Sequence, residues 1–122
     1  MNGPDPKELK KGGMIPQTTE GLFAMRVHVT GGNLGTAQME AIRKAADRFG
    51  RGRVHLTSRQ GVEIPDVPLD ALAPAKEFLA ASGLTVGGAG ATVRTVTACP
   101  GCRTCRRGVI DAPSLAAAID RE

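Results

Sequence analysis

Aromatic residues are scarce in this 122-residue chain, which has three Phe and no Tyr or Trp. The core must therefore be built from Val, Leu, Ile, Met and Ala, which together with Phe and Cys make up 41% of the sequence. The scarcity also argues against a nucleic-acid-binding sheet that stacks bases on aromatic side chains, so we expect no nucleic-acid partner. The net charge of +4, with a pI of about 9.3, still favours anionic partners over cationic ones.

Long apolar runs are also absent. No segment approaches the ~20 apolar residues of a membrane-spanning helix, and we expect no membrane partner. Residues 1–13 are polar and carry no apolar signal-peptide core. These absences favour a cytoplasmic protein, and the length suits one domain with a modest core.

Cysteine is confined to Cys99, Cys102 and Cys105, spaced as C-x2-C-x2-C. An odd, tight cluster is a poor disulfide framework and more typical of an iron–sulfur or zinc site. Arginines next to it would offset the negative charge of bound thiolates. The alternative is a set of three free surface thiols, because a fourth cysteine that would complete a four-Cys site is missing from the sequence.

Hydrophobic periodicity divides residues 21–98 into strands and helices. Met25, Val27 and Val29 alternate with polar residues, which indicates a half-buried strand. Apolar residues then recur at helical spacing after Thr36, a good N-cap residue, and Gly50 is a natural helix stop. The expected ranges are a strand over 22–30, a helix over 36–49, strands over 53–57 and 62–64, a helix over 69–82 and a strand over 92–98.

This order predicts an α+β fold, a ferredoxin-like split βαβ sandwich with a four-stranded antiparallel sheet and two helices on one face. The first strand of that topology lies between the third and the fourth. We expect residues 1–20 to be an extended N-terminal arm, not a packed element, and residues 113–120 to form a short helix. The expected core consists of Met25, Val27, Val29, Ile42, Phe49, Leu56 and Leu79.

Arginines at polar positions form a candidate anion site. Arg26 and Arg94 belong to strands expected to be neighbours, so both would face the open side of the sheet, and Arg59 follows in a turn at the sheet end. Guanidinium groups bind oxyanions through forked hydrogen bonds, although ordinary solvated strand residues would give the same pattern. His28 and His55 each stand alone in a strand, which is more typical of a solvent-facing or hydrogen-bonded histidine than of a metal ligand.

Four blocks of sequence, in this order and spacing, resemble the sirohaem-dependent nitrite and sulfite reductases. The resemblance covers roughly residues 12–120. It implies a ferredoxin-like half-domain over 21–98, followed over 99–122 by a truncated iron–sulfur segment. The blocks are GLFAMRVHVTGG (21–32), LTSRQGVEI (56–64), TVRTVTAC (92–99) and the cysteine loop that begins CPG at residue 99.

The resemblance implies a role for each matching residue. One group is catalytic and contacts the substrate anion, a second holds the carboxylates of sirohaem, and a third supplies the first cysteine pair of a 4Fe–4S cluster. These groups are Arg26 and Arg94; Thr57, Arg59 and Gln60; and Cys99 and Cys105, with Cys102 between the last two as a spare thiol or an alternative ligand.

The implied activity is that of an oxidoreductase. In the family, electrons pass from the cluster to the sirohaem iron, which binds sulfite through sulfur or nitrite through nitrogen, while basic groups stabilise the anion. The family's later C-x3-C pair is not in this sequence, so we expect both cofactors to be absent or incomplete and the chain alone to be inactive. We interpret the sequence as an excised piece of such a reductase. Its electron-donor protein is unknown, and pairing of two copies as a homodimer is left open.

Other functions are compatible with the same features. One is an iron–sulfur electron-transfer module without sirohaem, against which the missing fourth cysteine counts for a monomer. Another is a basic nucleic-acid-binding domain on the same fold, which the charge permits but the lack of paired aromatics disfavours. A structural zinc site is a third alternative.

Overall fold

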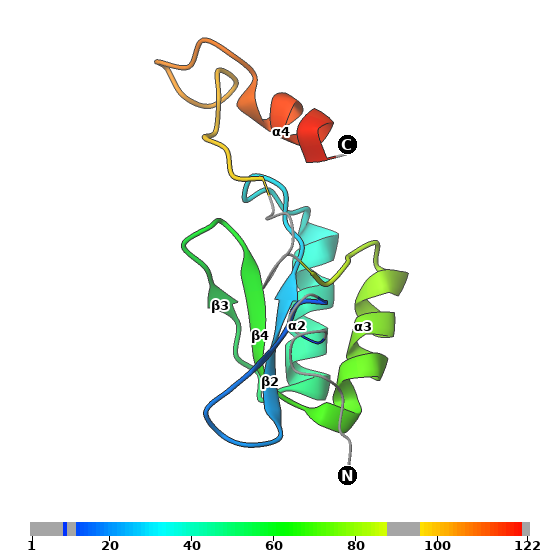
Figure 1. Cartoon of the computed structure of the whole chain (residues 1–122). Coiled ribbons are helices and arrows are strands. Elements are labelled where there is room, and N and C mark those ends of the chain that lie inside the picture. The colour runs from blue at the N-terminus through cyan, green and yellow to red at the C-terminus, as the bar shows by residue number, and fades with distance from the viewer. Residues whose placement is uncertain (1–8, 10–11, 88–95, 121–122) are drawn as a thin grey trace.

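The computed structural model describes residues 9, 12–87 and 96–120, and it contains a four-stranded antiparallel sheet with helices packed on it (Figure 1). The strand order in the sheet is β1-β2-β4-β3. The expected α+β, ferredoxin-like fold class is confirmed. In chain order the elements are β1 (Met14–Pro16), β2 (Leu22–Val27), α2 (Thr36–Phe49), β3 (His55–Leu56), β4 (Val62–Pro68), a 3₁₀ turn (Leu69–Ala71), α3 (Leu72–Ala81) and α4 (Ala112–Asp120).

The core lies between the sheet and the two helices α2 and α3, which lie on the same side of it (Figure 1). In β2, buried and half-buried residues alternate strictly, as expected for a strand with one face on the core. Five of the seven residues expected in the core are buried in it, and Phe49 is partly buried and packs against it. The exception is Leu56, whose exposed fraction is 75%. Because β3 is a two-residue edge strand, Leu56 lies beyond the cover of the helices, and the expectation that it faces inward is wrong.

Strand β4 is longer than the third expected strand. Pro65 was expected to end that strand, but β4 continues to Pro68. The register places Pro65 and Asp66 opposite the single residue Ala24 of β2, which is a β-bulge. A bulge removes the need for a ladder hydrogen bond at that point, so the proline is tolerated inside the strand.

Strand β1 pairs with the edge of β2 that faces away from β4, where the strand over 92–98 was expected. Residues 14–16, expected within an unpacked arm, form β1 on this edge, and Met14 is buried. Of the expected fourth strand over 92–98, residues 92–95 lie outside the described residues and 96–98 form no strand. The chain does return to β2 after α3: Val86 bridges Val27, and the His28 N–H donates to the Thr85 carbonyl over 2.8 Å.

Helix α2 ends where the sequence predicts, but its N-cap differs from the expected residue. The N-cap of α2 is Gly35, not Thr36, and the Gly35 N–H donates to the Gln38 side chain over 2.9 Å. Gly50 ends α2 as expected. Pro74 is the third residue of α3, where a missing N–H costs no intrahelical bond. In the described part of the chain, no helix is both long and apolar enough to cross a bilayer.

Helix α4 is tied back to the residues that follow β2. The Asp120 carboxylate accepts hydrogen bonds from His28 Nε2 at 2.8 Å and from Thr30 Oγ1 at 2.9 Å. Burial raises the pKa of Asp120, but the hydrogen bonds from Thr30 and His28, with the attraction of the histidine charge, outweigh it and hold the pKa below its ordinary value. The expectation of a hydrogen-bonded His28 is thereby confirmed.

Replacing Asp120 by Asn should destabilise the chain in a pH-dependent manner. Because the folded-state pKa of Asp120 is depressed, its contribution is present above the unfolded pKa of about 4 and is lost as the pH falls through the folded value. The difference in free energy of unfolding between wild type and Asp120→Asn should therefore have its full value above about pH 5 and shrink towards about pH 3. Urea titrations at several pH values measure it, and a difference that grows on acidification would contradict the assignment.

Removing a buried and an exposed leucine should have very different effects. Leu79 is fully buried, so Leu79→Ala should cost about 2–5 kcal/mol of unfolding free energy. Leu56→Ala, the matched control at an exposed edge position, should change it by less than about 0.5 kcal/mol. Urea denaturation of both variants measures the two costs. Equal costs would mean that Leu56 packs in the core after all.

Candidate functional site

A tight turn between β3 and β4 carries three of the residues that the sequence singles out. The Thr57 N–H donates to the Gly61 carbonyl, and the Gly61 N–H donates to Thr57 Oγ1, each over 2.9 Å. Thr57 thus closes the turn with both its backbone and its side chain. Arg59 and Gln60 are exposed on it, and Gln60 has a left-handed backbone with φ of +62°.

This turn contacts the segment that leads into the cysteines. Gln60 Nε2 donates to the Ala98 carbonyl over 2.7 Å, and the Ala98 N–H donates to Gln60 Oε1 over 2.8 Å. The loop after β2 joins them, because the Gly31 N–H donates to the Val96 carbonyl over 2.9 Å. A Cβ at Gly32 would lie 3.2 Å from the Cβ of Gln60, so this loop approaches the turn closely. Three segments far apart in sequence therefore meet at one point.

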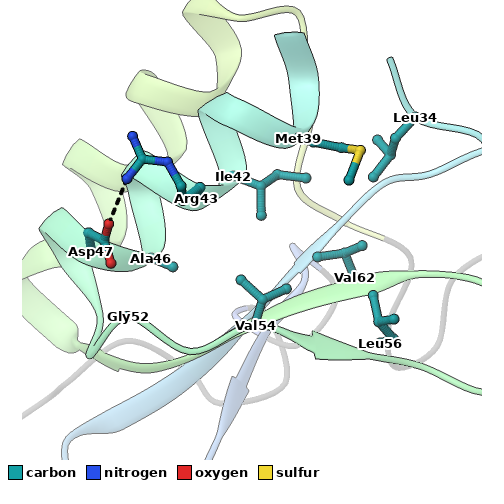
Figure 2. Close-up of a pocket in the computed structure, with 10 residues that line it drawn as sticks. All are labelled: Leu34, Met39, Ile42, Arg43, Ala46, Asp47, Gly52, Val54, Leu56 and Val62. Atoms are coloured by element: carbon teal, nitrogen blue, oxygen red, sulfur yellow. Dashed lines mark hydrogen bonds and ion pairs between the residues drawn. The ribbon is translucent and has the colours of Figure 1, made fainter. Parts of the chain in front are cut away.

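A cleft of about 560 Å³ opens at this meeting point. A second, apolar pocket of about 260 Å³ shares four of its lining residues and lies between α2 and the β3 edge. Figure 2 shows Met39 and Ile42 of α2 across this pocket from Val54 and Val62. The sequence did not predict the pocket, because Leu56 was expected in the core. The four shared residues are Leu34, Met39, Leu56 and Val62.

Arg26 lies on the polar side of β2, as the alternation predicts, but it has a partner. Its guanidinium donates to Glu63 Oε2 through Nε at 3.0 Å and through Nη2 at 2.6 Å, and the two residues are in register on β2 and β4. Glu63 was missed, although its place between the apolar Val62 and Ile64 puts it on the same polar face. Arg94, the expected companion of Arg26, lies outside the described residues.

Cys99, Cys102 and Cys105 are exposed and free. Their loop is compact: the Cys102 N–H donates to the Ile110 carbonyl over 2.7 Å, and the Cys105 N–H donates to the Gly101 carbonyl over 2.8 Å. Arg103 forms an ion pair with Asp111 at 2.7 Å. Its positive charge is therefore partly neutralised and offsets less of the negative charge of bound thiolates. Across the described ranges, no three His, Cys, Asp or Glu side chains gather closely enough to hold a metal ion. The thiols are accessible, yet these residues do not form a finished site.

Among the described residues, neither histidine belongs to a group of three potential metal ligands. His28 binds Asp120, and His55 is exposed in β3. Of the predicted residues, the structure thus gathers Thr57 and Gln60 at the cleft, close in sequence to Arg59, and leaves Arg26 on the sheet face.

Comparisons with known proteins give the chain its relatives. A family model for the nitrite/sulfite reductase ferredoxin-like half domain matches residues 15–82. The chloroplastic ferredoxin–nitrite reductase of Zea mays is 33% identical over 113 residues, which are 90% of this chain and 20% of that protein. An uncharacterised protein of Methanocaldococcus jannaschii is 32% identical over 100 residues, 82% of this chain and 36% of that protein.

The match extends over most of the chain but over little of each relative. The chain spans about a fifth of the maize enzyme and about a third of the archaeal protein. A shorter match, 38% identical over 55 residues, joins it to the chloroplastic ferredoxin–nitrite reductase of Arabidopsis thaliana. The family model covers more than half of the chain, including β2, α2, β4 and α3. The chain therefore belongs to the family of nitrite/sulfite reductase ferredoxin-like half domains.

Proposed function

We propose that this half-domain supplies substrate-anion and sirohaem-binding residues to a sirohaem- and 4Fe–4S-dependent nitrite or sulfite reductase. The observation that supports this most directly is the contact between the Thr57–Gly61 turn and Ala98, the residue before Cys99. By the sequence resemblance, the turn matches the family's sirohaem-binding segment and Cys99 matches a cluster ligand. Electron transfer between two cofactors needs them close together, and this contact brings their two segments together in one chain.

The cleft beside the turn fits the edge of a large, carboxylate-bearing cofactor. Thr57 and Gln60 line it, and the wall has no side chain at the two positions Gly31 and Gly32. Arg59 is an exposed residue of the same turn, and a guanidinium can bind a carboxylate through charge-assisted hydrogen bonds. When bound, sirohaem supplies the iron that holds and reduces the anion. The chain's own residues then bind its periphery and orient it.

The cysteine loop fits a 4Fe–4S cluster only in part. Cys99 and Cys105 are exposed and present thiols that can each bind iron, and Cys102 is a third thiol of the same loop. The described residues bring no three such ligands together, so further ligands from the rest of the reductase have to complete the cluster. We assign the loop a role in holding the cluster.

We also expect a cytoplasmic location for the protein.

Arg26 is the candidate anion-binding residue within the described chain. Its side chain is 25% exposed, and its pairing with Glu63 fixes the guanidinium on the polar face of the sheet. Nε and Nη2 of Arg26 donate the hydrogen bonds to Glu63 Oε2. Because a guanidinium has five N–H donors, Arg26 has further N–H groups that can bind sulfite or nitrite. Arg94 would complete the site, as the resemblance implies.

Substitutions of the pair should separate anion binding from folding. In the complete reductase, Arg26→Gln should weaken sulfite or nitrite binding about 10- to 100-fold, because a charged hydrogen bond contributes about 1.5–3 kcal/mol. Glu63→Gln, the matched control, removes the carboxylate that competes with the anion and should leave binding equal or tighter. Anion titrations followed through the haem absorbance measure both. Equal weakening in the two variants would show that the pair serves the fold alone.

Arg59→Ala should lower sirohaem retention in the complete reductase by about tenfold, as expected for one lost charged hydrogen bond. Sirohaem per protein after gel filtration, read from absorbance, measures the loss. Ser58→Ala, one position earlier on the exposed turn, should retain wild-type cofactor content. A wild-type protein that takes up iron–sulfur cluster but no sirohaem would favour an electron-transfer module instead.

A further inference from the structure

We propose that Gln60 is a positioning residue that fixes the chain at the entrance to Cys99, and that its amide does not bind sirohaem. The family resemblance places Gln60 in the sirohaem-binding turn, but its side chain is engaged elsewhere. The assignment goes beyond the proposed function, and it rests on that function only for the identity of the group that Cys99 holds.

The geometry of the contact supports a clamp. Both ends of the Gln60 amide bind one residue: Nε2 donates to the Ala98 carbonyl at 2.7 Å, and Oε1 accepts from the Ala98 N–H at 2.8 Å. A residue pair in an antiparallel sheet exchanges the same two bonds. The side chain therefore replaces a neighbouring strand for Ala98. An amide engaged in this way has one of its two donors and one of its two acceptor lone pairs committed to Ala98, and it is no longer free to turn towards a cofactor.

The backbone of Gln60 gives an independent argument. Its φ of +62° lies in the left-handed region, which glycine occupies freely and other residues at a cost of about 1–3 kcal/mol. Glycine at this position would remove that cost but also the side chain. A strained non-glycine residue points to a use for its side chain, and among the described residues the Gln60 side chain forms its hydrogen bonds with Ala98. Gly32 leaves the space in which this side chain runs, since a Cβ there would lie 3.2 Å from the Gln60 Cβ.

The clamped segment has few other attachments. Residues 96–100 form no helix or strand. Within the described residues, their backbone is held by Gln60 at Ala98 and by Gly31, whose N–H donates to the Val96 carbonyl over 2.9 Å. Cys99 follows Ala98 directly and is itself exposed. Releasing Gln60 should therefore free the backbone on the N-terminal side of this thiol while leaving the core intact.

Amide hydrogen exchange of the 122-residue chain, measured by NMR without any cofactor, tests the clamp. Gln60→Met keeps the length of the side chain but neither hydrogen bond, and Gln60→Asn keeps the amide but is too short to reach Ala98. In both variants the Ala98 amide should exchange about tenfold faster, and the Gly31 amide should follow. Amides inside α2 should keep their wild-type rates. Ser58→Ala is the matched control on the same turn and should change none of these rates.

Wild-type exchange at Ala98 in both Gln60 variants would overturn the clamp. So would a complete reductase in which Gln60→Met loses sirohaem as extensively as Arg59→Ala, because the amide would then bind the cofactor. The expected result is retained sirohaem with an altered visible circular dichroism of the cluster. A wild-type reductase that binds neither cofactor would contradict the proposed function but not the clamp, because the exchange experiment needs neither.

Discussion

The register between β2 and β4 is the constraint on which the other features depend. Met25 pairs with Ile64 and Val27 with Val62, which puts four apolar side chains on the core face. The intervening pair, Arg26 and Glu63, then faces the other side. If one strand shifted by one residue, its apolar side chains would face the solvent and its member of the Arg26–Glu63 pair would be buried alone, at a cost of several kcal/mol for the uncompensated charge. The same packing that stabilises the sheet therefore fixes the position of the candidate anion-binding arginine.

Glutamine side chains stabilise the chain where its backbone leaves regular structure. In the described residues, Gln60 and Asp66 are the non-glycine residues with positive φ. Gln60 binds the backbone of Ala98, while Gln17 donates to the Asp66 carboxylate and accepts from the Asp66 N–H over 2.7 Å. Both amides supply donors and acceptors that a regular ladder would otherwise provide. A small domain poor in aromatics can in this way hold its irregular segments without a larger core.

The sequence predicted those parts of the fold that local periodicity governs. The alternation in β2 and the helical spacing of α2 both appear in the structure, and Arg26 faces away from the core as expected. The wrong predictions concern residues whose burial or pairing depends on tertiary contacts. Leu56 looks like a core residue by alternation, but β3 is too short and too far to the edge to bury it. Residues 14–16 have no pattern of their own and become a strand only because the edge of β2 is open to them.

The residues of the candidate site could be predicted from the sequence, but their interaction partners could not. Sequence motifs singled out Arg26, Gln60 and the cysteines, whereas their partners are distant: Glu63 lies 37 residues from Arg26, and Ala98 lies 38 from Gln60. Local sequence patterns do not predict pairs that are so far apart in the sequence. The partners also change the chemistry, because Arg26 is not an isolated cation. An anion bound there would join an existing ion pair, so its affinity would depend on how much of the arginine's charge Glu63 already neutralises.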